Sequence, residues 1–428
     1  MKTKILHLIL PAMAILSACT TQEPVPHADQ DSKISDANAS AQISVQEAAE
    51  IAIKASAQFF PEKSRAGIIS VENVIPILST RCPSRSMADP LFYVVNYEDS
   101  AGFALVNALK AEPAIIGISD KGTYNASDLS KNPDGLNFLV DYIVESAPSN
   151  KAITTNPLRP PYELNEITYD TIKYDIQVPK VKTEWHQVGF FGKFCPNGNA
   201  GCFPVAVAQA LSVYKKPVTL WPTYPDAPVS SLIIPWDEII PLKINSRIPS
   251  KLEDDKNIYP HEALGILLRE IGHNSNVYYS ETLTYWYPGE ANLPKEFITN
   301  SRLKMSSLSP TYNNFPECRS QIKNGVVVMN GYASETSTYA NIGHAWVVDG
   351  YQDVKIKVTD WVRKESSSTW EIWQESYIDF FYVHINWGFG GDGNGYFRPD
   401  ALRFNISSGN KTEFYNFDHR FNYTVISE

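Results

Sequence analysis

The chain has little cysteine, and its cysteines form no local cluster. Five occur in 428 residues, with no CxxC pair and no spacing that suits a zinc site. Isolated buried thiols explain Cys82 and Cys318 most simply, although an oxidising compartment would also permit a disulfide such as Cys195 with Cys318. The other two cysteines, Cys19 and Cys202, stand in distinctive surroundings.

Long basic runs and internal repeats are also missing. The net charge is −10 and no stripe of lysine and arginine occurs, so we expect no nucleic-acid partner. Apolar residues make up 43% and charged residues 20% of the chain, which is typical of a protein that buries a real core. The length suggests two or three domains. The 12% of aromatic residues suits an extracytoplasmic enzyme or a binder of peptides or sugars.

Apart from the N-terminus, no apolar run approaches the ~20 residues needed to span a bilayer. The first residues, MKTK followed by ILHLILPAMAIL, have the form of a signal peptide. LSAC follows at 16–19 and resembles a bacterial lipobox, which predicts cleavage before Cys19 and lipidation of its thiol. A plain secretory signal is the alternative. Residues 20–40 are polar and read as a flexible tether. We therefore expect an extracytoplasmic protein that is lipid-anchored to a bacterial membrane or cell surface and that processing can release.

Two regions of mixed helix and strand pattern follow the tether. The first, 41–150, begins with a helix over 43–60 whose Ser44 and Glu47 form a capping box. It continues with a hairpin over 91–109 and a helix over 137–147. Residues 148–180 are rich in Pro, Asn and Thr and are expected to be irregular, with an exposed linker at 151–180. The second region, 181–428, combines helices with apolar strands. A helix over 261–272 is expected to end at Gly272.

Cys202 opens a helix in the stretch NAGCFPVAVAQALSVY, residues 199–214. Apolar residues recur from Phe203 at helical spacing, and Pro204 is tolerated in a first helical turn. The unpaired N–H groups at such a terminus favour a thiolate. This pattern indicates a nucleophile, whereas a buried small hydrophobe or half of a disulfide are the alternatives.

Of the eight histidines, His344 and His384 lie on predicted strands, and His344 begins its strand directly after Gly343. The residues between them form a long hairpin with its tip near 365–368. An antiparallel register then places His344 opposite a residue between Asn386 and Gly388, unless a bulge shifts it. We interpret His384, on the same face as Asn386, as a structural strand residue rather than a second active-site group.

Cys, His and Asn are the three side chains of a papain-like thiol protease. The histidine takes the thiol proton, and the asparagine fixes the tautomer of the ring. Trp387 would shield that hydrogen bond from water. The oxyanion hole also needs donors, which the Cys202 backbone N–H and the side chain of Gln187 can supply.

These blocks, together with the residues before them, resemble the streptopain family of bacterial cysteine proteases. The resemblance rests on GCFPVAVAQALSVYKKP, IGHAWVVDGYQ, FYVHINWGFGGDGNGYFRPDAL and TEWHQ, and YVVNYEDSAGFALVNALKAEPAIIGISDKGTYN resembles the family's prodomain. It covers roughly residues 41–405. It implies an α+β fold: a papain-like cysteine protease catalytic domain over 181–428, preceded by a smaller inhibitory α+β prodomain over 41–150. The precursor would be inactive until the linker at 151–180 is cleaved.

By this resemblance the site residues receive specific roles: Cys202 is the nucleophile, His344 the base, Gln187 the oxyanion donor, and Asn386 with Trp387 the supports of the histidine. The chain departs from the family pattern at Phe203-Pro204, at Phe389 and in VGFFG after Gln187. These departures affect the expected substrate preference more than the chemistry.

The predicted activity is hydrolysis of protein or peptide substrates without a cofactor or metal. The glycines of GFGGDGNGYF lack the Lys-Ser/Thr of a phosphate loop, and DGN lacks the closing Glu of a calcium loop. The prodomain is the predicted intramolecular inhibitor. A non-catalytic or inhibitory binding protein that keeps the fold is the main alternative, and a transferase with the same Cys-His pair is another.

Overall fold

The computed structural model describes most of the chain after the predicted tether. The described residues are 42–66, 69–78, 90–109, 114–146, 164–247, 258–281, 284–285, 295–308, 318–332, 343–363, 368–398, 403–408, 411–416 and 422–428. The predicted signal peptide, tether, lipidation site Cys19 and Cys82 lie outside these residues. No helix within the described ranges is long and apolar enough to cross a membrane.

The region predicted as a prodomain packs helices against antiparallel strands. Its elements are α2 (Val45–Phe59), α3 (Pro61–Ala66), β1 (Val71–Leu78), β2 (Pro90–Tyr97), η1 (Glu98–Ser100), β3 (Phe103–Asn107), β4 (Ile115–Ser119), η2 (Leu129–Lys131) and α4 (Asp134–Ser146). The predicted capping box is present: Ser44 Oγ accepts from Glu47 N, and Glu47 accepts from Ser44 N. The predicted hairpin is the antiparallel pair of β2 and β3.

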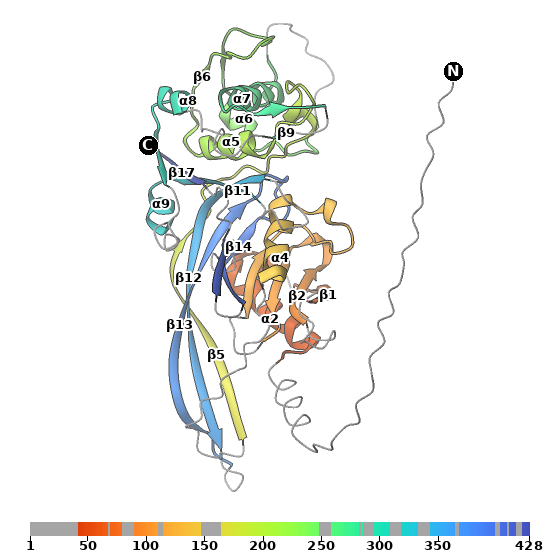
Figure 1. Ribbon diagram of the computed structural model, residues 1–428, viewed down its shortest axis with the longest axis vertical. Coiled ribbons are helices and arrows are strands. Elements are labelled where there is room, and N and C mark those ends of the chain that lie inside the picture. Colours follow the sequence, from red (N-terminus) through yellow and green to blue (C-terminus); the bar gives the residue numbers. More distant parts are fainter. Residues whose placement is uncertain are drawn as a thin grey trace, which may run out of the picture. The chain divides into compact units, whose positions relative to one another are not determined.

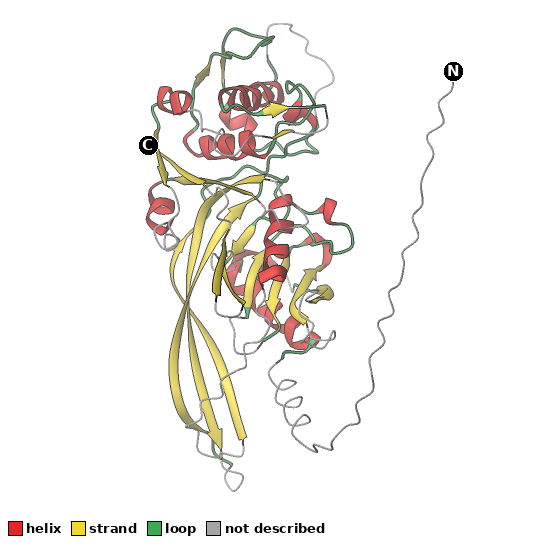
Figure 2. Ribbon diagram, in the orientation of Figure 1, coloured by secondary structure: helices red, strands yellow, loops and turns green. Residues whose placement is uncertain are grey.

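Most helices after residue 181 gather on one side of the sheet strands (Figure 2). They are η3 (Gly189–Gly192), α5 (Cys202–Tyr214), α6 (Trp236–Ile239), α7 (Pro260–Asn274) and α8 (Lys295–Asn300). Helix α9 (Cys318–Asn324) packs on the other face, where Cys318 and Ile322 join the core that contains Val327 and Trp346. Helix α7 does not end at Gly272 as predicted: it continues to Asn274 and is capped by Ser275. A side chain at Gly272 would collide with the Tyr279 hydroxyl, so close packing rather than helix termination accounts for this glycine.

The long strands β5 (Leu164–Gln177), β12 (Gly343–Arg363) and β13 (Glu371–Asn386) lie side by side (Figure 1). The other strands of this region are β6 (Thr219–Leu220), β7 (Leu232–Ile233), β8 (Tyr278–Tyr279), β9 (Thr284–Tyr285), β10 (Lys304–Leu308), β11 (Val326–Tyr332), β14 (Gly395–Phe397), β15 (Arg403–Ser408), β16 (Lys411–Asn416) and β17 (Asn422–Ser427). The predicted long hairpin is β12 with β13.

One sheet joins the two predicted regions. Its order is β1-β2-β3-β4-β14-β13-β12-β11-β17-β10, and β5 pairs with β12 beside this path. The link is β4 with β14, where Gly117 lies opposite Phe397 and Ser119 opposite Gly395. Residues Ile43–Glu428 accordingly form one compact unit.

The expectation of irregular structure over 148–180 is wrong for residues 164–177, which form β5. This strand pairs with β12 from Leu164 opposite Arg363 to Gln177 opposite Tyr351. Its sequence, LNEITYDTIKYDIQ, mixes β-branched and aromatic residues with polar ones, which suits a strand. The prediction of irregular structure rested on the neighbouring prolines and asparagines rather than on this pattern.

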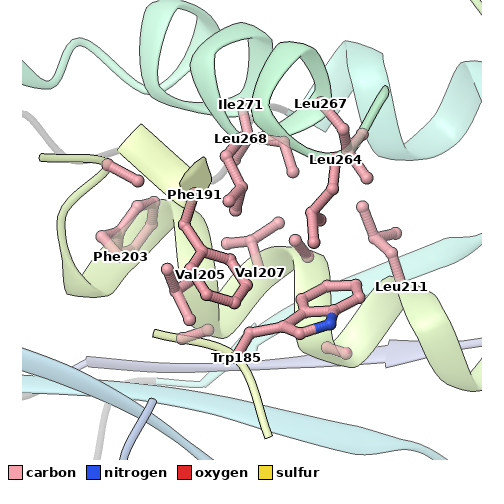
Figure 3. Packing of buried hydrophobic residues seen from close by; sticks show 14 of the residues in the cluster. Trp185, Phe191, Phe203, Val205, Val207, Leu211, Leu264, Leu267, Leu268 and Ile271 are labelled. Carbon is pink, nitrogen blue, oxygen red and sulfur yellow. The ribbon is translucent and has the colours of Figure 1, made fainter. Parts of the chain in front are cut away.

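The first hydrophobic core lies between α5 and α7. Figure 3 shows Phe203, Val205, Val207 and Leu211 of α5 packed with Leu264, Leu267, Leu268 and Ile271 of α7 around Trp185 and Phe191. Helix α5 also packs on β11 and β12. This core therefore fixes the helix that begins at Cys202 against the strand that carries His344.

Candidate active site

Cys202 is the first residue of α5, as the sequence predicts. Gly201 precedes it as the N-cap with a φ of 85°, a conformation that side chains other than glycine rarely adopt. A Cβ at Gly201 would also lie 2.6 Å from Thr284 Cγ2. The preceding loop is held by Asn199, whose Oδ1 accepts from Gly201 N at 2.9 Å. The backbone thus places Cys202 where the N–H groups of a first helical turn stabilise negative charge.

Gln187 is joined to this loop through its backbone. Its carbonyl oxygen accepts from Ala200 N at 2.8 Å, two residues before Cys202. Its own N–H donates to His186 Nδ1 at 2.8 Å, and the His186 ring packs on Phe389 with centroids 4.6 Å apart. The half-buried side chain of Gln187 is therefore carried by a segment that is fixed to the loop before Cys202.

His344 lies at the beginning of β12 and is only 5% exposed. Its Nε2 is 3.1 Å from the backbone oxygen of Trp387. The ring stacks beside Trp346 and lies at a tilt to Trp387, with centroids 6.2 and 6.3 Å away. These contacts bring His344 and Trp387 together, as the sequence predicts.

The predicted register around His344 is shifted. Asn386 lies opposite Val347, and His344 pairs instead with Gly331 of β11. The difference is already present near the hairpin tip, where Val362 lies opposite Glu371, and the two register shifts further along the hairpin offset each other.

Asn386 is buried, and within the described residues its side chain bonds to Gly388, Gln209 and Thr183 rather than to His344. Its Oδ1 accepts from Gly388 N at 3.1 Å and from Gln209 Nε2 at 3.1 Å, and its Nδ2 donates to Thr183 O at 3.0 Å. The carbonyl group that contacts the histidine belongs to the next residue, Trp387. No sequence pattern pointed to Gln209 or Thr183, which lie far from Asn386 along the chain.

The glycine-rich turn after Asn386 holds Trp387. The Trp387 backbone N–H donates to Asn394 Oδ1 at 2.9 Å, and its indole Nε1 donates to Gly393 O at 3.1 Å. Gly388, Gly390, Gly391 and Gly393 all have positive φ. This turn folds back on the tryptophan next to the histidine.

The first turn of α4 lies against this histidine. A Cβ at Gly135 would be 2.5 Å from Trp387 Cε3 and 2.6 Å from His344 Cδ2. Both rings are therefore covered by backbone from the predicted prodomain.

An ion pair also joins the predicted prodomain to the catalytic region. Lys121 Nζ lies 2.7 Å from Glu184 Oε2 and donates to Gly390 O at 2.9 Å. Lys243 Nζ also lies 2.7 Å from Glu184 Oε2. Burial raises the pKa of the Glu184 carboxyl, but the two lysines outweigh it and hold that pKa below its ordinary value.

Comparison with known proteins agrees with this geometry. The model of the Peptidase C10 family matches residues 185–397, which include Cys202, His344 and Asn386. The chain belongs to the Peptidase C10 family. It is a cysteine peptidase, and its fold combines helices and strands as the predicted α+β class requires.

The N-terminal region has its own match. Residues 40–146 match the model of the Spi protease inhibitor, so this C10 peptidase carries a prodomain and is a zymogen. A solved fragment of Prevotella intermedia prointerpain A is 18% identical, with a TM-score of 0.47, and the match covers 82% of this chain and 97% of that one. No curated protein matches this chain.

In this C10 peptidase, the other described cysteines and His384 lie where a structural role suits them. Cys195, Cys202 and Cys318, the cysteines that the structure describes, are all reduced and buried, so the disulfide considered for Cys195 and Cys318 is not formed. His384 Nδ1 lies 2.6 Å from Asp349 Oδ1, and Asp349 Oδ2 accepts from Val181 N at 2.7 Å. This pair anchors the chain where the catalytic region begins.

Proposed function

We propose that this C10 peptidase is a secreted, lipid-anchored cysteine endopeptidase that works through Cys202 and His344. Support for the nucleophile comes from the position of Cys202 at the N-terminus of α5, directly after a glycine with positive φ. Support for the base comes from His344, a buried imidazole on β12, the strand on which α5 packs. Trp387 supplies the backbone oxygen that orients the ring.

The proposed reaction follows from these groups. His344 takes the thiol proton, and the Cys202 sulfur attacks the carbonyl carbon of the scissile peptide bond. The negative charge that develops on the carbonyl oxygen is stabilised by the Cys202 backbone N–H and the Gln187 side-chain amide. His344 then gives its proton to the leaving amine, which breaks the C–N bond and leaves an acyl-enzyme. Water activated by His344 releases the carboxylic acid and restores the thiol.

The contact between α4 and His344 carries the proposal that the prodomain inhibits this site. The first turn of α4 packs on both His344 and Trp387, so a substrate cannot occupy that space while the prodomain is bound. Because the two regions are covalently joined, the effective concentration of the prodomain is high, and modest affinity suffices for latency.

Activation then requires a cut that leaves β5 with the enzyme. β5 is hydrogen-bonded along β12, and strands within a sheet resist proteases better than exposed loops. Lys180, just after β5, also donates to the backbone oxygens of Lys323 and Gly325 near the end of α9. We place the activation cleavage before Leu164, which gives a mature fragment of about 30 kDa at ordinary residue masses.

Replacement of the nucleophile tests the enzymatic proposal. Cys202→Ala should abolish peptide hydrolysis and labelling by an epoxide thiol-protease inhibitor, and it should change the melting temperature little because alanine fills most of the site. Cys195→Ala is the matched control and should retain most activity. Residual hydrolysis near the wild-type level in Cys202→Ala would contradict the proposal and favour a binding or inhibitory protein.

The lipid anchor is tested at Cys19. A metabolically supplied fatty-acid analogue should label the protein expressed in its bacterial host, because the acyl chain is attached to the Cys19 residue. The label should be lost in Cys19→Ala. Cys82→Ala is the matched control and should keep the label. Unchanged labelling in Cys19→Ala would exclude this cysteine as the lipidation site.

A further inference from the structure

Gln209 is a polar residue in an otherwise apolar, fully buried part of α5. It is 0% exposed, and its neighbours Val205, Val207 and Leu211 belong to the core between α5 and α7 (Figure 3). A buried amide costs free energy unless it is hydrogen-bonded. An aliphatic side chain would pack at this position without that cost, so the contact made by the amide is the feature to explain.

That contact connects the nucleophile helix to the segment beside the base. Gln209 lies seven residues after Cys202, so two helical turns place both on the same face of α5. Its Nε2 donates to Asn386 Oδ1 at 3.1 Å.

The bonds of Asn386 define the orientation of its amide. Thr183 O can only accept, and Gly388 N and Gln209 Nε2 donate. A flipped Asn386 amide would place its NH₂ group against two donors and its oxygen against a carbonyl. Gln209 therefore supplies one of two donors that hold Asn386 Oδ1 in place.

We propose that Gln209 is a positioning residue for the catalytic base. By fixing Asn386, it fixes the adjoining Trp387 carbonyl group, which lies 3.1 Å from His344 Nε2. A series of contacts thus runs from Cys202 along α5 to Gln209, and from there through Asn386 and Trp387 to His344. It holds the base in a fixed position relative to the nucleophile. This inference rests on the proposed roles of Cys202 and His344.

Two substitutions separate positioning from packing. Gln209→Leu keeps the approximate volume and removes the donor. Gln209→Glu has no donor when ionised and sets a carboxylate against the Asn386 oxygen, whereas its protonated form restores a donor as O–H. The ratio of variant to wild-type kcat should therefore rise as the pH falls for Gln209→Glu and stay flat for Gln209→Leu.

The test uses the matured enzymes, with competent sites counted by epoxide titration. Gln209→Leu should lower kcat about tenfold, which corresponds to about 1.4 kcal/mol of activation free energy, and change KM by less than about twofold. Asn386→Ala should lower kcat at least as much. If Gln209 acts through Asn386, the double variant should match Asn386→Ala alone.

Val207→Ala is the matched control, since Val207 is buried on the same helix. It should lower the melting temperature and leave kcat unchanged. Independent effects of Gln209→Leu and Asn386→Ala that multiply in the double variant, or a pH-independent ratio for Gln209→Glu, would overturn the proposal. A wild-type protein that neither binds the epoxide nor cleaves peptides would instead overturn the proposed function, and this inference with it.

Discussion

At the residue scale, the described cysteines show how surroundings decide the chemistry of one side chain. Burial raises the pKa of the Cys195 thiol to about 11, so this thiol stays protonated and unreactive at neutral pH. Cys318 begins helix α9, just as Cys202 begins α5. A helix N-terminus alone therefore does not identify the proposed nucleophile, since α5 and α9 both pack on β12, the strand of His344. Cys202 differs because the loop before it is bonded to Gln187.

The same scale shows what could be predicted from the sequence. Cys202 and His344 stand out because each has a local pattern around it: a glycine and a helix for one, a glycine and a strand for the other. Gln209 could not be found in this way, because its partner Asn386 is 177 residues away and no local pattern links them. The register error at His344 comes from the assumed position of the hairpin tip, because a shift of the tip moves every pair along the hairpin.

At the element scale, the proposed latency depends on helix α4, and the proposed position of the activation cleavage depends on strand β5. The sequence predicts a helix over 137–147, and α4 occupies Asp134–Ser146. Its contact with His344 depends on tertiary packing and could not be predicted from periodicity. Strand β5 reverses the expectation for its segment: residues predicted as linker are part of the sheet.

The absence of a side chain at Gly135 is the property of α4 that allows this contact. Gly135→Ala should favour the helix by about 1 kcal/mol through propensity, yet its Cβ would meet Trp387 and His344 at 2.5 to 2.6 Å. We therefore expect weaker latency, seen as faster epoxide labelling of Cys202 in the uncut chain. Gln46→Ala, at an exposed position of helix α2 in the same prodomain, is the control and should label like wild type. Labelling of Gly135→Ala as slow as that of wild type would show that α4 does not restrict access to His344.

At the scale of the whole molecule, prodomain and catalytic region share hydrophobic cores as well as the sheet. The second core combines Phe92, Phe103 and Leu136 from the prodomain with Trp346, Trp387, Val383 and Phe397 from the catalytic region. The sequence predicted the α+β class and the order of the two regions. It could not predict that β4 pairs with β14, because the sequence of a strand does not identify a partner strand that is distant along the chain. Release of the prodomain must therefore break strand pairing and core packing as well as surface contacts.

The ionic contact of Glu184 with Lys121 makes this release depend on pH. The pKa of the Glu184 carboxyl is held below its ordinary value of 4.5, so the carboxylate is paired above that pH. Its stabilising contribution is fully present above pH 4.5 and is lost as the pH falls through the lowered pKa. Lys243 belongs to the catalytic region and stays with Glu184, so only the share of Lys121 is lost on release.

This dependence can be measured on Cys202→Ala protein whose chain has been cut between α4 and β5 by an added protease. Size-exclusion chromatography should show the prodomain retained at neutral pH and increasingly released as the pH falls below 4.5. Lys121→Ala should lower retention at neutral pH by up to about fivefold in affinity, as expected for a partly exposed ion pair of ~1 kcal/mol or less, and should flatten the dependence at acid pH. Lys131→Ala removes an ion pair with Asp128 inside the prodomain and should behave as wild type. Identical retention of Lys121→Ala and wild type at every pH would show that strand pairing and the shared core alone hold the prodomain.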